Sequence, residues 1–187
     1  GIRGIDGKFL DKKLIIKIAR ALVRFYKKNK LCKVLLVGND SRISSDYILS
    51  NLESILLEYG INVENLGKCS SPCLAYITKK FNYPLSMMIS ASHNSSEYNG
   101  IKFFNANGEK IIDIKTSLGE KNFALRKNVE FLKDFYVSHL KELKNFNFPL
   151  IIDCANGGVS EICKQIFEKS KIIHANPNGY NINHDCG

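Results

Sequence analysis

Residues 85–104 read LSMMISASHNSSEYNGIKFF and place a polar loop between two apolar segments. The segment Leu85–Ser90 has the length and apolar character of a buried strand, and Ile101–Phe104 predicts a second one. Asn107-Gly108 then predicts a tight turn between hairpin partners. Because open α/β sheets bind their ligands where strands end, the loop is the first candidate for a functional site.

Strand and helix signals alternate along the rest of the chain, which favours an α/β domain with a mostly parallel or mixed sheet. A 3.6-residue apolar period predicts a helix from Asp11, which can cap it, to about Lys28. Gly60 is typical of a helix end, and Pro72 of a helix start. The remaining predictions are strands at 33–37, 62–66, 150–154 and 171–174, and helices at 44–59, 128–143 and 159–169.

The segment Asn145–Pro149 predicts a linker, because a new strand–turn–helix–strand unit begins after it. We therefore expect one domain over residues 1–145 and the beginning of a similar second domain over residues 146–187. The second segment is too short to bury a core of its own. The sequence is thus expected to be part of a longer protein.

The composition, with 44% hydrophobic and 24% charged residues, is that of a globular chain. No apolar run reaches the roughly 18 residues of a transmembrane helix, so no membrane partner is expected. The first residues lack the apolar region of a signal peptide. These features predict a cytoplasmic protein.

The net charge of +9 requires nucleic-acid binding to be considered. Much of the excess is lysine on predicted helices, with acidic residues interspersed, which is typical of a solvated basic surface. A small anionic substrate would also need only a few cations. The sequence therefore does not predict a nucleic-acid partner.

Six cysteines without a secretory signal favour free thiols over a disulfide framework. Cys69 and Cys73 do not have the usual spacing of a zinc site, Pro72 stiffens their loop, and no second pair follows. Cys154 lies in an apolar run and is expected to pack as a small hydrophobic residue.

Three side chains in and beside the polar loop have the chemistry of an active site. Ser92 is a candidate nucleophile, His93 a candidate proton carrier, and Lys102 a nearby cation. An ordinary polar hairpin loop has a similar composition, and the Gly-x-Ser-x-Gly motif of serine hydrolases is absent from the sequence. For loops of this composition in general, the ordinary polar loop is the favoured interpretation.

Two arginines in other predicted loops could each bind a phosphate in bidentate fashion. Arg3 lies between Gly1 and Gly4, in a segment that we interpret as a loop, and Arg42 follows a strand. An internal ion pair between Arg42 and Asp40 is the better interpretation of that second arginine. The sequence contains neither a Walker A loop nor Gly-x-Gly-x-x-Gly, so nucleotide binding is not predicted.

Seven segments in the same order resemble the α-D-phosphohexomutase superfamily, and the resemblance covers essentially the whole chain. It implies a first domain of that superfamily, with a mixed sheet between two layers of helices (α/β/α), followed by the beginning of a similar second domain. The last two segments resemble, in particular, the branch that isomerises glucosamine phosphates. The segments are GIRG (1–4), GNDSR (38–42), SPCLAY (71–76), SASHN (90–94), NGIKFF (99–104), DCANG (153–157), and NIN (181–183) followed by CG (186–187).

The resemblance implies an isomerase that interconverts glucosamine 6-phosphate and glucosamine 1-phosphate, a step towards UDP-N-acetylglucosamine. Ser92 corresponds to a phosphoserine that gives its phosphoryl group to the sugar, forming glucosamine 1,6-bisphosphate, and then takes the other one back. By the same analogy His93 and Lys102 handle protons or hold the reacting phosphate, and Arg3 lies beside it. The implied cofactor is Mg²⁺, bound by the Ser92 phosphate and by aspartates expected beyond residue 187.

The chain departs from the family pattern at Ser95, where the family usually has proline. Sugar choice depends largely on regions expected beyond residue 187, so phosphomannomutase or phosphoglucomutase activity remains an alternative. A non-catalytic module that binds phosphosugars or nucleic acid is a second alternative, supported only by the net charge. The oligomeric state is not predicted.

Overall fold

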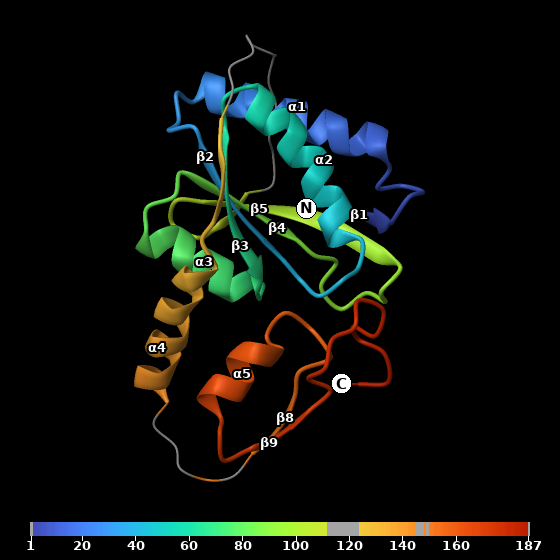
Figure 1. The fold of residues 1–187 in the computed structure, drawn as a ribbon, viewed down its shortest axis with the longest axis vertical. Helices are drawn as coiled ribbons and strands as arrows, with labels where there is room; N and C mark the ends of the chain where they lie inside the picture. The colour runs from blue at the N-terminus through green and yellow to red at the C-terminus, as the bar shows by residue number, and fades with distance from the viewer. Residues whose placement is uncertain (1, 112–123, 145–147, 149, 187) are drawn as a thin grey trace.

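A mixed β-sheet organises the molecule in the computed structural model, which describes residues 2–111, 124–144, 148 and 150–186 (Figure 1). Its strand order is β1-β5-β4-β2-β3-β7, with β6 paired to β5. Strand β2 is parallel to both β3 and β4, and β3 is parallel to β7. Strand β5 is antiparallel to β1, β4 and β6. The strands are β1 (Ile2–Ile5), β2 (Val34–Asn39), β3 (Asn62–Lys68), β4 (Leu85–Ile89), β5 (Tyr98–Asn105), β6 (Lys110–Ile111) and β7 (Arg126–Asn128).

Local capping signals explain where the helices begin and end. The Asp11 side chain accepts a hydrogen bond of 2.8 Å from the Leu14 amide and caps α1 as predicted. Gly60 follows the end of α2 with a φ of +77°, a conformation that favours glycine. None of the described helices is long and apolar enough to cross a membrane. The helices are α1 (Lys12–Lys28), α2 (Ser45–Glu58), α3 (Ser71–Lys80), α4 (Lys133–Leu143) and α5 (Ser160–Ile166), with a 3₁₀ turn at Glu130–Leu132.

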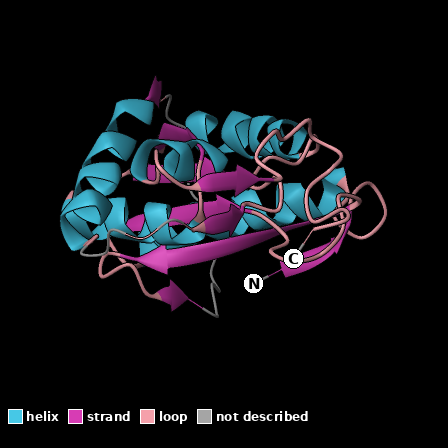
Figure 2. Cartoon of the chain, turned by 90° about the horizontal axis from the view of Figure 1, so that it is seen from below, coloured by secondary structure: helices cyan, strands magenta, loops and turns pink. Residues whose placement is uncertain are grey.

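Two hydrophobic cores lie on opposite faces of the sheet, because successive side chains of a strand point to opposite sides. On β2, Leu35 and Val37 belong to the core that α1 and α2 cover, whereas Leu36 belongs to the core under α3 and α4. Figure 2 shows helices on both sides of the sheet. The predicted three-layered mixed α/β fold is therefore confirmed.

Two strands were not predicted from the sequence. The interpretation of residues 1–4 as a loop is wrong, because Ile2–Ile5 pairs with β5 along its whole length. Arg126–Asn128 joins the edge of the sheet beside β3, and the predicted helix at 128–143 begins with the 3₁₀ turn and continues as α4. Of the predicted linker, residues 145–147 and 149 lie outside the described residues.

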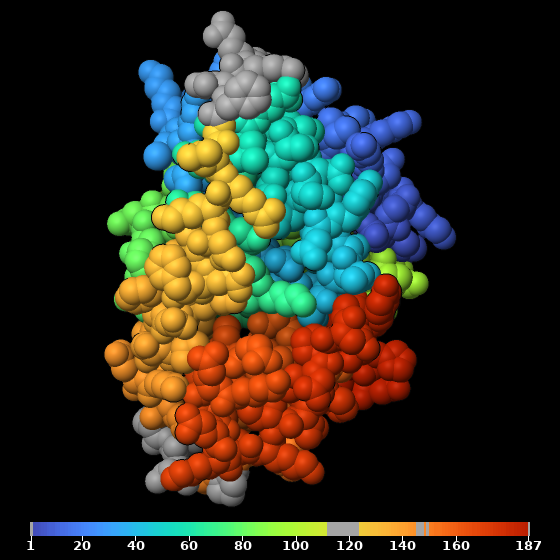
Figure 3. All heavy atoms as spheres, viewed as in Figure 1, coloured from blue at the N-terminus to red at the C-terminus, as the bar shows by residue number. Residues whose placement is uncertain are grey.

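The C-terminal unit, defined here as residues 150–186, contains a second, two-stranded parallel sheet of β8 (Ile151–Asp153) and β9 (Lys171–Ile173). Ile162 and Ile166 of its helix α5 join the core beneath α3 and α4. Figure 3 shows this unit packed against the end of the main sheet and against α4. Its apolar residues are thus buried partly by the preceding elements.

The cysteines follow the expectation of free thiols. All six are free, and Cys69, Cys73 and Cys154 are buried. Cys154 packs against Cys163 and Ala175 in a small core of the C-terminal unit, where it behaves as a small hydrophobic residue as predicted.

Gly158 allows the C-terminal unit to approach the main sheet closely. A Cβ atom at this position would lie 2.3 Å from the Cys69 carbonyl oxygen and 2.8 Å from its carbon. Because these are main-chain atoms, they cannot rotate away, and the two units would have to separate. The neighbouring Gly157 has only one such contact, at 3.3 Å from the Cys154 oxygen.

We predict that Gly158→Ala lowers the free energy of unfolding by about 1–3 kcal/mol through overpacking. Gly157→Ala, the matched control, should cost clearly less. Urea denaturation of both variants measures the difference. Equal losses would mean that the contact with Cys69 does not limit the packing.

Candidate active site

The polar loop between β4 and β5 presents Ser92 to solvent at the carboxyl end of β4. The Ser90 amide donates to the Gly100 carbonyl at 2.8 Å, and the Ser90 hydroxyl accepts a bond of 3.0 Å from the Ser92 amide. Ser92 itself has a φ of +58°, an uncommon conformation for a serine. The loop therefore holds the Ser92 backbone in a defined position while leaving the side chain exposed.

Lys102 lies directly beside the Ser92 hydroxyl. Its Nζ atom donates to Ser92 Oγ at 2.7 Å, across the hairpin that β4 and β5 form. Burial, and then repulsion by the Arg3 guanidinium, lowers the pKa of the Lys102 ammonium group. An ammonium at this distance stabilises negative charge that develops on Oγ or on a group attached to it.

Arg3 reaches the same loop from the neighbouring strand. It stands opposite Gly100 in the pairing of β1 with β5, and its Nη1 atom donates to Asn94 Oδ1 at 3.1 Å. Arg3 is exposed, so its guanidinium remains accessible to an anion. His93 is also exposed, and its ring forms no hydrogen bond with the described residues. The structure thus brings Ser92, Lys102 and Arg3 together, whereas His93 faces solvent.

A buried arginine holds the loop from below. Arg42 is 2% exposed, and its Nε atom donates to Asp40 Oδ2 at 2.9 Å. This confirms the predicted ion pair. The other two nitrogens donate to loop carbonyls: Nη1 to Ser95 and, at 2.8 Å, to Tyr98; Nη2 to Ser92 at 3.1 Å and to Asn94 at 2.8 Å.

The C-terminal unit holds the loop from a second side. Asn183 Nδ2 donates to the carbonyl oxygens of Ser92 and Asn94, at 2.9 Å each. Ser41 Oγ donates to the Asn156 carbonyl at 2.6 Å, which ties the same unit to the segment that carries Arg42. Sequence reasoning assigned no role to Asn183, because an amide that binds main-chain carbonyls has no recognisable spacing pattern.

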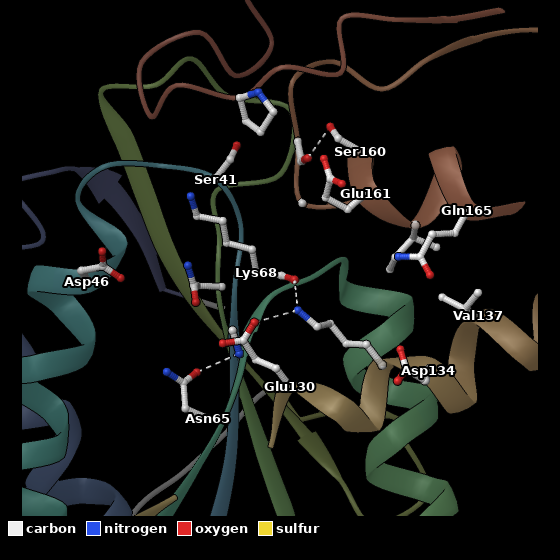
Figure 4. Close-up of a pocket in the computed structure, with 17 residues that line it drawn as sticks. Ser41, Asp46, Asn65, Lys68, Glu130, Asp134, Val137, Ser160, Glu161 and Gln165 are labelled. Carbon is white, nitrogen blue, oxygen red and sulfur yellow. Dashed lines mark hydrogen bonds and ion pairs between the residues drawn. The ribbon is translucent and has the colours of Figure 1, made fainter. Parts of the chain in front are cut away.

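A polar cleft of about 450 Å³ lies between the main sheet and the C-terminal unit (Figure 4). Lys133 Nζ bridges Glu130 Oε2 at 3.2 Å and the Lys68 carbonyl at 3.3 Å on one of its walls. The hydrogen bond from the Asn128 side-chain amide is the main cause that lowers the pKa of Glu130, and Lys133 lowers it further. Ser92, His93, Lys102 and Arg3 do not line this cleft, so it is separate from the candidate active site.

The family described as "Phosphoglucomutase/phosphomannomutase, alpha/beta/alpha domain I" matches residues 1–126, which include the whole Ser92 loop, Arg3 and Arg42. Over the full chain, the sequence is 34% identical to phosphoglucosamine mutase of Clostridium kluyveri and 35% identical to that of Dictyoglomus thermophilum. The chain covers 47% and 45% of these two proteins, so it spans about half the length of the curated relatives that it matches.

Solved structures share the fold. A phosphoglucomutase/phosphomannomutase family protein from Burkholderia thailandensis superposes with a TM-score of 0.78 at 20% identity, over 97% of this chain and 44% of that one. Parafusin, a phosphoglucomutase from Paramecium, superposes with a TM-score of 0.70 at 17% identity, over 96% of this chain and 43% of its own. The family match over residues 1–126, together with the similarity of the whole chain to two curated relatives, shows that the chain belongs to the phosphoglucomutase/phosphomannomutase family.

Proposed function

We propose that this chain is the phosphoserine-bearing part of a phosphohexomutase that interconverts glucosamine 6-phosphate and glucosamine 1-phosphate. The observation that carries the proposal is the 2.7 Å contact between Lys102 Nζ and the exposed Ser92 Oγ. The substrate class is supported by the curated relatives, which are phosphoglucosamine mutases, and by the segments that resemble that branch. Such a reaction is an isomerisation that supplies an amino-sugar phosphate, and we infer that it takes place in the cytoplasm.

The proposed reaction has two phosphoryl transfers. In the first, the sugar's free hydroxyl at C1 attacks the phosphorus while the bond between phosphorus and Ser92 Oγ breaks, and the hydroxyl proton passes through a proton carrier of the site to Oγ. The product is glucosamine 1,6-bisphosphate, which turns so that its C6 phosphate faces Ser92. In the second, Ser92 Oγ attacks the phosphorus at C6 and gives its proton back, so that the bond to O6 breaks, glucosamine 1-phosphate leaves with a free C6 hydroxyl, and phosphoserine is restored. A covalent carrier of this kind divides one exchange between two ends of a sugar into two in-line steps.

Each site residue has a part in this scheme. Lys102 stabilises negative charge on Oγ when the phosphoryl group leaves, and Arg3 binds the reacting phosphate from its exposed position on β1. His93 is proposed as a proton carrier, because its exposed ring is free to turn towards a bound sugar. Positioning and charge stabilisation are the main requirements of phosphoryl transfer.

The family is generally metal-dependent, and we propose Mg²⁺ as the ion. Ser92 would hold it through its phosphate oxygens, which are the hard ligands that Mg²⁺ prefers. By the resemblance to the family, the remaining ligands are proposed to be aspartates beyond residue 187. When bound, the ion neutralises negative charge on the phosphoryl group being transferred.

We also propose that residues 1–145 form the first domain and that residues 146–187 begin the second. The separate β8–β9 sheet supports this division. In this arrangement the C-terminal unit completes the support of the Ser92 loop through Asn183.

In the full-length protein, Ser92→Ala should abolish the phosphoserine and reduce mutase activity by roughly 10³-fold or more, because the covalent carrier is lost. Ser96→Ala, in the same loop, is the matched control and should keep both. Peptide mass spectrometry measures the phosphoserine, and a coupled assay with glucosamine, glucose and mannose phosphates measures activity and sugar choice. Activity that survives in Ser92→Ala would refute the mechanism, whereas a preference for glucose or mannose phosphates would refute only the substrate.

Removing the cation at Lys102 should slow both transfers. Lys102→Met is expected to lower kcat by about 10²–10³-fold, because charge on Oγ is then unsupported. In the unphosphorylated protein, where its pKa is lowered, the Lys102 ammonium should lose its proton below the ordinary lysine value of about 10.4, which an NMR pH titration measures. Lys102→Arg should keep more activity than Lys102→Met, because a guanidinium is also a cation. Equal losses in the two variants would show that charge at this position does not support the transfer.

Arg42 is proposed as a positioning residue. Arg42→Lys keeps the charge but cannot serve Asp40 and four carbonyls at once, so the loop should lose its defined geometry. We expect kcat to fall by about 10–100-fold, with a much smaller change in KM. Arg126→Lys, which changes an exposed arginine paired with the buried Glu53, is the control and should leave both constants unchanged. A loss of thermal stability without a change in kcat would show that Arg42 has only a structural role.

A further inference from the structure

Three side chains with different metal-binding atoms converge in the C-terminal unit, and none of them belongs to the Ser92 loop. They are Asp153, His174 and Cys186, and one ligand atom from each lies within 4.8 Å of the other two. The proposed function uses none of them. Carboxylate oxygen, imidazole nitrogen and thiolate sulfur are the three protein ligands that Zn²⁺ takes.

The fold itself brings these residues together. Asp153 is the last residue of β8 and pairs with Ile173, the last residue of the parallel strand β9, so that His174 follows directly beside it. The main-chain N–H of Asn183 donates to the Ala155 carbonyl at 2.9 Å. This bond holds the segment that leads to Cys186 beside the ends of β8 and β9. Cys186 follows three residues later.

The Asp153 carboxylate is already oriented. Its Oδ1 atom accepts a hydrogen bond of 2.8 Å from the Ala155 amide, which leaves Oδ2 facing the His174 Nδ1 atom at 2.9 Å. Ligands around a tetrahedral Zn²⁺ lie about 3.3–3.7 Å apart, given metal–ligand bonds of about 2.0–2.3 Å. The present separations therefore need only small side-chain movements to fit an ion.

We propose that Asp153, His174 and Cys186 form a binding site for Zn²⁺ or a similar borderline divalent ion. Binding through His174 Nδ1 requires the ring proton to be on Nε2, and the thiol proton of Cys186 is released to solvent. Ligand bonds from the Asp153 carboxylate, the neutral imidazole and the thiolate then form. Since Asp153 and His174 are exposed and Cys186 is only partly buried, solvent has access to a fourth position. The site shares no residue with the proposed Mg²⁺ site at Ser92. Its thiolate ligand also favours Zn²⁺ over Mg²⁺.

Such an ion would stabilise the segment that supports the Ser92 loop. Asn183, which binds the Ser92 and Asn94 carbonyls, lies between Ala155 and Cys186 in the same fold-back. A metal ion bound by Asp153, His174 and Cys186 would link residues that precede and follow Asn183 in the chain. The ion is therefore structural in this proposal and takes no part in phosphoryl transfer.

Cobalt titration of the metal-free, full-length protein tests the site, because Co²⁺ bound to a thiolate gives a charge-transfer absorption band. We expect one equivalent of Co²⁺ to produce this band, Zn²⁺ to remove it by displacement, and excess Mg²⁺ to leave it unchanged. Cys186→Ser should eliminate the band and weaken Zn²⁺ binding by about 100-fold or more. Cys32→Ser, which replaces an exposed thiol elsewhere, is the matched control and should retain both.

A second variant, His174→Ala, should weaken Zn²⁺ binding without altering the circular dichroism spectrum, which separates loss of the site from loss of the fold. A band that survives in Cys186→Ser, or binding that is equally weak in all variants, would overturn the proposal and indicate adventitious surface binding. Mutase activity is not part of this test, so its result is independent of the proposed reaction.

Discussion

The buried guanidinium of Arg42 is the constraint on which the candidate site depends. A charge removed from water requires a counter-ion and hydrogen-bond acceptors for its remaining donors, or its burial is strongly unfavourable. Asp40 supplies the counter-ion, and the carbonyls of Ser92, Asn94, Ser95 and Tyr98 supply the acceptors. Arginine burial and loop conformation therefore stabilise each other, and Ser92 remains exposed at a defined place.

The Ser92 loop is consequently held from two parts of the chain that are far apart in sequence. Arg42 acts from the end of β2, and Asn183 acts from the C-terminal unit. The same unit is anchored by the Ser41–Asn156 hydrogen bond and by the close approach of Gly158 to Cys69. The proposed metal site would act at the far end of this support, since it closes the fold-back that contains Asn183.

Much of the fold could be predicted because its signals are local. The apolar period and the Asp11 cap specify α1 within one segment, and Gly60 marks the end of α2 through its own backbone conformation. Strands β1 and β7 were not predicted, because the signals that make them strands are not local. Ile2–Ile5 contains a glycine and an arginine, and Arg126–Asn128 is entirely polar, so each is a strand only because a partner strand lies beside it.

The sequence by itself determined the exposed loop, its serine and the nearby lysine, because Ser92 and Lys102 are only ten residues apart on one hairpin. Only the tertiary structure decided how that loop is supported and which other side chains converge. Arg42 and Asn183 lie 50 and 91 residues from Ser92 and bind its main-chain carbonyl, which every residue possesses. The same holds for the proposed metal site. Its ligands meet only where the parallel strands β8 and β9 and the segment that carries Cys186 pack together. Contacts of this kind leave no spacing pattern in a sequence, because they depend on distances that only the folded chain creates.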